Sequence, residues 1–282
     1  MRIWIIALLA LFLVACSPAG DASSGDGGEE KEKTENKQEE EKEEEKTEDT
    51  NGEEEQKKEA EETKGMKETE EPIEPQYTLQ EDWSFAPIND AEEKVALLTI
   101  DDAPDEHAVE MAEKLKEKKA PAIFFVNGHF LDTPEEEEML KEIHAMGFPI
   151  GNHTMTHASL PDLSQEEQRE EIVGLSDRIE KIIGERPEFF RAPFGQNTEY
   201  SKQLVQEEGM LLMNWTYGYD WNEEYTNAEA LSDIMVNTPL LRNGANLLMH
   251  DREWTNNALN DIVTGLRDKG YTLLNPEKIE RP

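Results

Sequence analysis

Seven apolar runs of strand length follow one another between residues 95 and 274, and stretches with helical spacing of apolar positions separate them. The runs lie at 95–99, 122–126, 149–151, 189–191, 211–215, 246–249 and 271–274. The helical stretches lie near 106–119, 134–146, 164–183, 199–208, 227–236 and 254–269. Alternating strands and helices predict one α/β domain with a parallel sheet. Seven strands favour a barrel, whose chemistry would sit at the carboxyl ends of the strands.

Three of the predicted helices begin with a capping-box pattern, a serine or threonine followed three residues later by glutamate. The pattern occurs at 133–136, 164–167 and 226–229. In a capping box, each of the two side chains satisfies a backbone N–H of the other residue. We therefore expect helices that are capped by Thr133, Ser164 and Thr226.

The chain begins with an apolar run, residues 1–15, that carries one charge at Arg2 and ends at Cys16. A bilayer requires about 20 apolar residues, so this run predicts a signal peptide and not a membrane span. The residues 13–16, LVAC, resemble the lipobox of bacterial lipoproteins. We expect Cys16 to be acylated and to anchor the protein to the outer face of the cell membrane. An ordinary secretory signal with an incidental cysteine is the alternative.

Residues 17–75 consist mainly of Glu, Lys, Thr, Gly and Ser. Such a segment cannot bury enough apolar surface to offset the entropy cost of folding, so we expect disorder. A single exposed helix through the Glu/Lys run is the competing interpretation. In both cases residues 16–75 form a tether, and residues 76–282 form the folded domain.

The net charge is −37, from 65 acidic and 28 basic residues. The acidic excess extends over the tether and the domain alike. Binding of nucleic acid requires a basic surface, so this class of partner is excluded. A neutral or cationic glycan is compatible with the negative charge of the domain. We also expect the protein to be a monomer.

Polar residues that suit catalysis follow four of the predicted strands directly. Asp101 and Asp102 follow the first strand, the segment 153–157 follows the third, Arg191 ends the fourth, and His250 follows the sixth. The carboxyl ends of parallel strands meet at one rim of a barrel, so these side chains are expected to lie together.

The segment 153–157 offers a pair of metal ligands. On a helical turn, His153 and His157 would face the same way and share one ion. The spacing alone is weak evidence, because it recurs by chance. Adjacent side chains on an extended backbone point in different directions, so one of Asp101 and Asp102 can ligate the ion while the other faces the substrate. A cap at the strand end is the alternative for these aspartates. Two histidines and one carboxylate leave a position open for water, as in catalytic metal sites.

Five segments together resemble the motifs of a known family. They are TIDDAP (99–104), HTMTH (153–157), RAPFG (191–195), DW (220–221) and LMH (248–250). In order and spacing they are similar to the polysaccharide deacetylases, the NodB-homology group or carbohydrate esterase family 4, over about 95–275. The resemblance implies a distorted (β/α) barrel with seven strands and a divalent metal, usually zinc. It also implies removal of N-acetyl groups from an amino-sugar polymer, such as peptidoglycan or a chitin-like oligosaccharide.

The resemblance implies a role for each motif residue. Asp102, His153 and His157 would hold the metal. Asp101 would act as the general base and His250 as the general acid.

The other motif residues would support these groups. Arg191 would position Asp101, and Asp220 would orient His250. The backbone N–H of Phe194 would stabilise the oxyanion, and Trp221 and Leu248 would form the walls of the acetyl pocket. A surface ion pair is the alternative for Arg191, and a purely packing role is the alternative for Trp221.

The sequence departs from the family pattern at several positions. Ala103 stands in place of a glycine, Ile100 in place of a frequent aromatic residue, and Phe194 in place of a frequent tyrosine. Gly218 or Tyr219 stands near the place of an earlier aspartate. The changes at Ala103, Ile100 and Phe194 remove no chemical group from the mechanism, because the oxyanion donor is a backbone N–H. His107, His129 and His144 are expected to be structural or exposed.

Two further hypotheses use the same residues. The site would also serve an O-acetyl polysaccharide esterase, in which His250 matters less because an alkoxide leaves more easily than an amine. A non-catalytic, glycan-binding lipoprotein would keep the barrel without the chemistry. The complete set of expected ligands, base and acid argues against the second hypothesis.

Overall fold

The computed structural model describes residues 73–282. The signal peptide, Cys16 and all but the last three residues of the expected tether lie outside the described residues. Within the described part, no helix is both long enough and apolar enough to cross a membrane.

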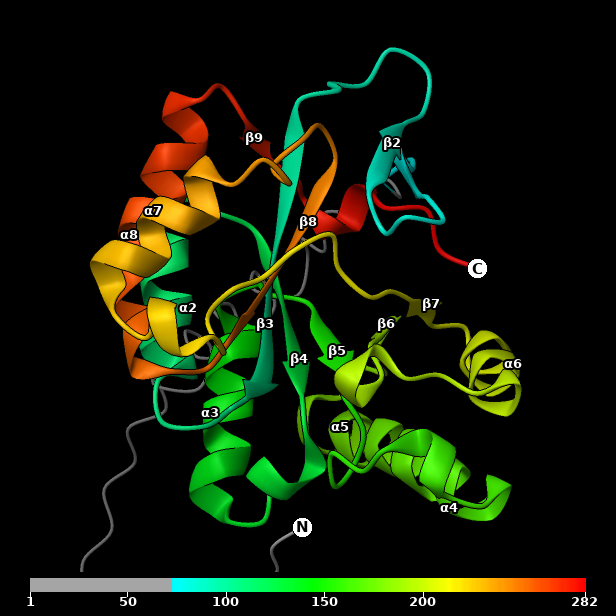
Figure 1. The fold of residues 1–282 in the computed structure, drawn as a ribbon. Coiled ribbons are helices and arrows are strands. Elements are labelled where there is room, and N and C mark those ends of the chain that lie inside the picture. The colour runs from blue at the N-terminus through cyan, green and yellow to red at the C-terminus, as the bar shows by residue number, and fades with distance from the viewer. Residues whose placement is uncertain (1–72) are drawn as a thin grey trace, which may run out of the picture. The chain divides into compact units, whose positions relative to one another are not determined.

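A curled parallel sheet of seven strands forms the centre of the domain (Figure 1). Its strands are β3 (Val95–Ala103), β4 (Ala122–Val126), β5 (Ile150–Asn152), β6 (Phe189–Phe190), β7 (Leu211–Leu212), β8 (Ala245–His250) and β9 (Thr272–Leu273). The order is β7-β6-β5-β4-β3-β8, with β9 paired to β3. After β7, Thr216 N donates to Asn246 O at 2.8 Å, so the chain returns from one edge of the sheet to β8 at the other. The predicted distorted barrel is confirmed as a partly closed barrel.

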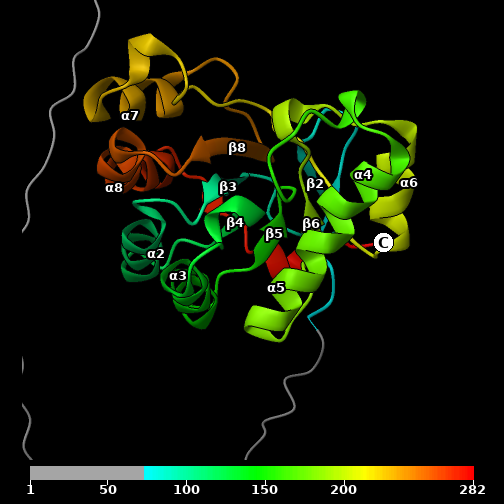
Figure 2. The same cartoon turned by 90° about the horizontal axis from the view of Figure 1, so that it is seen from below.

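Helices cover the outside of this sheet (Figures 1 and 2). They are α2 (Ala108–Glu117), α3 (Pro134–Ala145), α4 (Gln165–Arg169), α5 (Leu175–Ile183), α6 (Glu199–Glu207), α7 (Ala228–Asn237) and α8 (Glu253–Asp268). The first two and the last two lie over β3, β4 and β8, and the other three lie beside β5–β7. A π-helical turn, Glu170–Gly174, separates α4 from α5. Short 3-10 turns occur at Gly128–Phe130, Leu160–Asp162, Pro193–Gly195, Glu223–Tyr225 and Pro276–Lys278.

Two of the three predicted capping boxes are confirmed, at Thr133 and Ser164. The prediction for Thr226 is wrong, because α7 begins one residue later and is capped by Asn227, whose side chain accepts from Ala230 N at 2.9 Å. The hydroxyl of Thr226 instead donates to Glu223 O in the preceding 3-10 turn. Asn is as good a cap as Ser or Thr, so the helix loses nothing by this shift.

Alternation along β3 decides which side chains reach the inside of the barrel. Leu98 and Ile100 belong to the cluster that packs on the helices, whereas Val95 and Leu97 belong to the interior cluster. Successive side chains of a strand point to opposite faces, so Asp101 continues the interior row. Asp101 is also the register partner of His250 on the neighbouring β8. The carboxylate of Asp101 and the imidazole of His250 therefore lie at the same rim of the barrel.

A small hairpin, β1 (Tyr77–Leu79) and β2 (Phe85–Pro87), was not predicted from the sequence. Tyr77 and Phe85 are buried in the interior cluster, next to the amino ends of the strands. Phe85 N donates to Gly244 O at 2.8 Å, which attaches the hairpin to the start of β8. Its strands are too short to show a periodic pattern.

This attachment predicts a large loss of stability for Gly244→Ala. Gly244 has φ +73°, and a Cβ atom would lie 1.9 Å from Phe85 O. We expect the free energy of unfolding to fall by roughly 3 kcal/mol, from left-handed strain and steric overlap together. Gly209 also has a left-handed backbone, with φ +72°, but a Cβ atom added there would meet no other atom within 4 Å. Gly209→Ala should therefore lower the free energy of unfolding by only about 1 kcal/mol. Urea unfolding of both variants measures the difference, and equal losses would contradict the assigned overlap.

Candidate active site

The predicted site residues converge at the carboxyl ends of the strands, around a cavity of ≈ 450 Å³. The cavity is lined by Asp101, Asp102, His153, His157, Ala192, Phe194, Trp215, Asp220, Trp221, Leu248, His250, Arg252 and Trp254. Every predicted site residue of the barrel except Arg191 is part of this lining. Arg191 lies in contact with Asp101.

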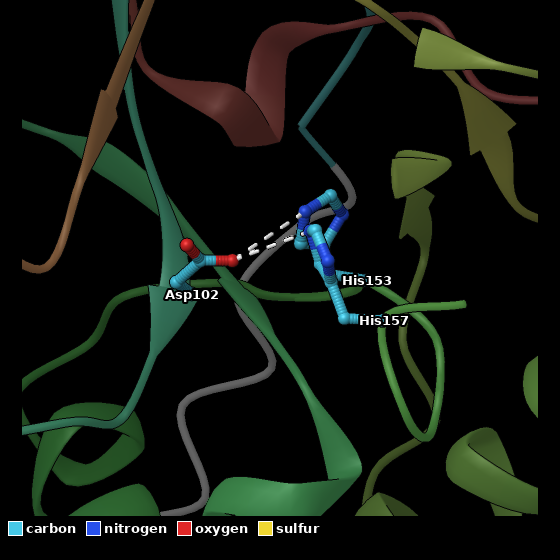
Figure 3. Close-up of side chains that lie close together, drawn as sticks. All are labelled: Asp102, His153 and His157. Carbon is cyan, nitrogen blue, oxygen red and sulfur yellow. Dashed lines mark ion pairs between the residues drawn. The ribbon is translucent and has the colours of Figure 1, made fainter. Parts of the chain in front are cut away.

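Asp102, His153 and His157 form a compact group of potential metal ligands (Figure 3). Asp102 Oδ1 lies 3.8 Å from His153 Nε2 and 3.6 Å from His157 Nε2. Ligand atoms around a tetrahedral zinc ion at about 2.1 Å are about 3.4 Å apart from one another. The spacing of these three atoms therefore fits a single divalent ion.

The two histidines do not lie on a helical turn, so that part of the prediction is wrong. Residues 153–157 form a loop after β5, in which Thr154 (φ 71°) and His157 (φ 59°) are left-handed. The loop curves back on itself and places the two imidazoles edge to face, with ring centroids 5.1 Å apart. The two rings therefore reach the same point beside Asp102 because of the loop conformation, and not because of helical periodicity.

His153 is held in the state that a metal ligand requires. Its Nδ1 lies 2.7 Å from Arg191 O, and a carbonyl can only accept, so Nδ1 carries the proton and Nε2 is free for the ion. Burial lowers the pKa of His153 to about 3, and burial also lowers the pKa of His157. Both rings are thus neutral near pH 7, as metal binding demands.

Asp102 is oriented by a contact that the motifs did not indicate. Its Oδ2 accepts from Arg252 Nη2 at 2.9 Å, which leaves Oδ1 directed at the histidines. Asp102 itself has a left-handed backbone, with φ 57°, at the point where the register between β3 and β4 shifts. Ala103 follows it as the last residue of β3 and is buried. The alanine that replaces the family's glycine therefore causes no left-handed strain at its own position.

Asp101 forms a buried ion pair with Arg191. Arg191 Nη1 donates to Asp101 Oδ1 at 2.6 Å and to Thr99 Oγ1 at 2.7 Å, and its guanidinium lies 4.3 Å from the ring centroid of Phe125. Arg191 is 0% exposed, so the surface ion-pair interpretation is wrong. Burial raises the pKa of Asp101, although the charge of Arg191 opposes the shift. A carboxylate with a raised pKa is better suited to accept a proton near neutral pH.

Asp220 lies beside His250, where the resemblance places it. His250 Nδ1 lies 2.8 Å from Asp220 Oδ1, and Asp220 Oδ2 accepts from Thr255 Oγ1 at 2.9 Å. Trp254 Nε1 donates to the Asp220 carbonyl at 2.7 Å. Burial lowers the pKa of His250, but the hydrogen bond and charge of Asp220 outweigh it, so the net pKa is raised. The ring is therefore biased toward its protonated form.

Comparisons with known proteins agree with this geometry. The model of the family described as polysaccharide deacetylase matches residues 88–213. A peptidoglycan-N-acetylglucosamine deacetylase of Bacillus cereus is 31% identical over 193 residues, which cover 65% of this chain and 70% of that protein. The chain belongs to the polysaccharide deacetylase family.

One further relative, PdaC, comes from Bacillus subtilis. The peptidoglycan-N-acetylmuramic acid deacetylase PdaC is 32% identical over 197 residues, which cover 68% of this chain and 40% of that protein. The chain thus spans less than half of the length of this relative. A solved structure of the peptidoglycan deacetylase PdaC has a TM-score of 0.59 at 29% identity and covers 66% of this chain and 90% of that one. The expected membership of the polysaccharide deacetylase family is confirmed.

In this member of the polysaccharide deacetylase family, aromatic side chains surround the mouth of the cavity. Trp221 is 50% exposed, with its ring centroid 5.5 Å from that of His250. Phe194 is 62% exposed, lies 4.9 Å from the ring of His157, and has a left-handed backbone. Leu248 is buried beneath them. A half-exposed ring at a cavity mouth speaks against a purely packing role for Trp221.

The family commonly has an aspartate earlier in the motif that contains Asp220, and neither Gly218 nor Tyr219 replaces it. A Cβ atom at Gly218 would lie 2.5 Å from Leu248 O, so this position has no room for a side chain. Tyr219 points elsewhere and shares a hydrogen bond of 2.6 Å with Thr238 Oγ1. Ile100 packs on the helices, so its replacement of an aromatic residue does not alter the cavity.

Three cavity residues escaped the sequence analysis, namely Trp215, Arg252 and Trp254. Arg252 was detectable, because it follows His250 and Asp251 at the end of a strand. Trp215 ends a predicted strand and gave no separate signal. Asp251 is not part of the cavity lining. Its carboxylate accepts hydrogen bonds of 2.7–2.9 Å from the backbone N–H groups of Asp105, His107 and Ala108, at the start of α2.

A second, larger cavity of ≈ 520 Å³ lies at the amino ends of β5 and β6. It contains none of the family motifs. His144, which contributes to its lining, pairs with Glu185 at 3.1 Å. His129 is exposed and stacks on Phe130, so the expectation for these two histidines holds.

The Asp220–His250 contact predicts a change in the pH dependence of activity. In Asp220→Asn the ring loses the carboxylate that raises its pKa, so His250 should release its proton at lower pH. A general acid must be protonated, so the alkaline limb of kcat/KM should move to lower pH. Rates of acetate release between pH 5 and 10 measure the limb, and an unmoved limb would contradict the assignment. Asp261→Asn, at an exposed position of α8, is the control.

Proposed function

We propose that this chain is a metal-dependent hydrolase that removes N-acetyl groups from an amino-sugar polymer, with peptidoglycan as the favoured substrate. The arrangement of one carboxylate and two neutral imidazoles beside Asp101 and His250 carries this proposal. The named relatives act on peptidoglycan, one at N-acetylmuramic acid and another at N-acetylglucosamine.

Asp102, His153 and His157 would hold the metal, and zinc is proposed. Two nitrogen ligands and one oxygen ligand, with a position left open, form a common catalytic zinc set. The bound ion would supply the positive charge that polarises the acetamide carbonyl and acidifies the attacking water.

The remaining chemistry falls to the protein's own side chains. Asp101 accepts the proton of the attacking water, and Arg191 holds this carboxylate in place through the 2.6 Å bond. His250 donates a proton to the nitrogen that leaves, since an amine anion is a poor leaving group. Asp220 holds Nδ1 of His250 and keeps the ring protonated.

Three residues would shape the acetyl pocket. The backbone N–H of Phe194 is proposed to donate to the oxyanion, as such amides do in many acyl-transfer sites. Leu248 and Trp221 would contact the acetyl methyl and exclude water from it, since both line the cavity.

The location of the enzyme is also part of the proposal. Relatives that act on peptidoglycan imply a site of action outside the cytoplasm. A lipid on Cys16 would anchor the chain, and residues 16–75 would link it to the catalytic domain, 76–282. The active unit is proposed to be a monomer.

Release of acetate tests this function. The purified chain is incubated with N-acetylglucosamine oligomers and with peptidoglycan, once with zinc and once with a chelator. We expect acetate with zinc and none with the chelator. Absence of zinc-dependent acetate from every substrate would favour the non-catalytic, glycan-binding hypothesis.

The role of His250 distinguishes N-acetyl from O-acetyl chemistry. In His250→Gln, hydrolysis of an N-acetylated oligomer should slow by about 10²–10⁴-fold, because no acid protonates the leaving amine. Hydrolysis of an O-acetylated xylan should slow by less than about tenfold, because an alkoxide leaves without full protonation. Initial rates on both substrates measure this. A parent chain that releases acetate only from the ester would identify an O-acetyl esterase.

A further inference from the structure

The loop of residues 153–157, which carries both proposed histidine ligands, has an irregular backbone. Two of its residues, Thr154 and His157, have left-handed backbones. Residues other than glycine adopt this conformation only at a cost, so surrounding contacts must hold the loop in place. The two histidines differ in the contacts that hold them.

His153 is fixed at its ring and His157 is not. The His153 ring donates from Nδ1 to Arg191 O, and its backbone carbonyl accepts from Asn127 Nδ2 at 2.5 Å. Within residues 73–282, no group makes a hydrogen bond to the ring nitrogens of His157. The side chain of His157 is also more exposed, at 28% against 3% for His153. The position of His157 therefore depends on the backbone that precedes it.

Glu171 holds that backbone. Its Oε2 accepts from Thr156 N at 2.8 Å, and its Oε1 accepts from Thr156 Oγ1 at 2.6 Å. Its own carbonyl accepts from Met155 N at 3.0 Å. Three hydrogen bonds thus join this one residue to the two residues before His157.

The π-helical turn explains why Glu171 is available for these contacts. Glu171 lies in the turn Glu170–Gly174, and the next carbonyl, of Ile172, accepts from Asn152 Nδ2 at 2.7 Å. Two successive carbonyls of this turn therefore bind the strand end and the loop that carry the ligands. π-Helical turns are frequent at functional sites.

The geometry points to Glu171 as a positioning residue that sets His157 for metal binding through Thr156. This role rests on the proposed function, because it presumes that the loop holds a metal. Glu171 does not line the catalytic cavity. Its loss should therefore weaken binding of the metal and leave the chemistry of the loaded enzyme intact.

Zinc affinity tests this role by competition with a chromogenic chelator on the full chain. In Glu171→Ala the dissociation constant for zinc should rise by about 10–100-fold, the usual effect of losing a contact behind a ligand. In Glu171→Gln it should stay within about threefold of the parent, because the amide accepts from Thr156 N and donates to its hydroxyl. At saturating zinc, kcat of both variants should stay within about twofold of the parent. Glu170→Ala, at an exposed position of the same turn, is the matched control.

The outcomes separate this inference from the proposed function. A parent chain that binds no zinc would overturn both. A parent that binds zinc, with an unchanged zinc dissociation constant in Glu171→Ala, would overturn only the role of Glu171. A lower kcat of Glu171→Ala at saturating zinc, with an unchanged affinity for zinc, would also overturn only the role of Glu171. If Glu171→Ala fails to fold, the zinc dissociation constant of Thr156→Ala decides. This variant removes only the hydroxyl contact with Glu171, so the constant should rise by less than in Glu171→Ala. An unchanged constant would overturn the role of Glu171.

Discussion

Replacement of His153 by alanine is expected to lower kcat/KM for acetate release by on the order of a thousandfold or more. His153 contributes one of three atoms that would hold the metal, and it is the ligand whose ring is fixed by a hydrogen bond to Arg191 O. A metal supplies several kcal/mol of charge stabilisation to the transition state, and each 1.4 kcal/mol is about tenfold in rate. The measurements are kcat/KM and the zinc content of the purified protein.

The control for this variant is His129→Ala. His129 is exposed and stacks on Phe130, outside the group of ligands. Zinc content and activity should both be preserved in it. Activity that survives His153→Ala at the parental level would show that the metal, if it takes part, is held elsewhere.

The second large effect is expected for Asp101→Asn. The amide cannot accept the proton of the attacking water, so kcat should fall by about 10²–10⁴-fold while KM changes little. Zinc content should be preserved, because Asp101 is not one of the three grouped ligands. Single-substrate kinetics and metal analysis of the same preparation measure both quantities.

Asp101→Asn also removes the charge partner of a fully buried arginine. Breaking a buried ion pair costs about 3–5 kcal/mol, so the melting temperature should fall as well. Activity is therefore compared at a temperature where circular dichroism shows the variant to be folded. Asp105→Asn changes a nearby aspartate that follows β3 and should retain activity. Undiminished acetate release from Asp101→Asn would mean that another group is the base.

The local pattern of residues determined much of the fold. Each of the seven apolar runs became a strand of the central sheet, and each helical stretch became one helix or an interrupted one. The places of Asp101 and His250, at the ends of two parallel strands, also determined that both lie at one rim of the barrel. These features depend on periodicity within one segment, so they are visible without the tertiary structure.

The short hairpin β1–β2 illustrates where this reasoning ends. Its two strands of three residues are stabilised by contacts with Gly244 and Ile279, more than 150 residues away in the chain. No period can appear within three residues. Arg252 was detectable by its place after β8, but its contact with Asp102 joins residues 150 positions apart and appears only in the folded domain.

The sequence by itself determined the order of strands and helices, the rim at which the motif residues meet, and the identity of the groups that could act there. Only the tertiary structure decided the left-handed loop of His157, the complete burial of Arg191, and the attachment of the loop to the π-helical turn through Glu171. The physical reason is that periodicity and motif spacing report the conformation of one segment at a time. The backbone angles of an irregular loop and the desolvation of a charge are set by segments that meet only when the whole domain has folded.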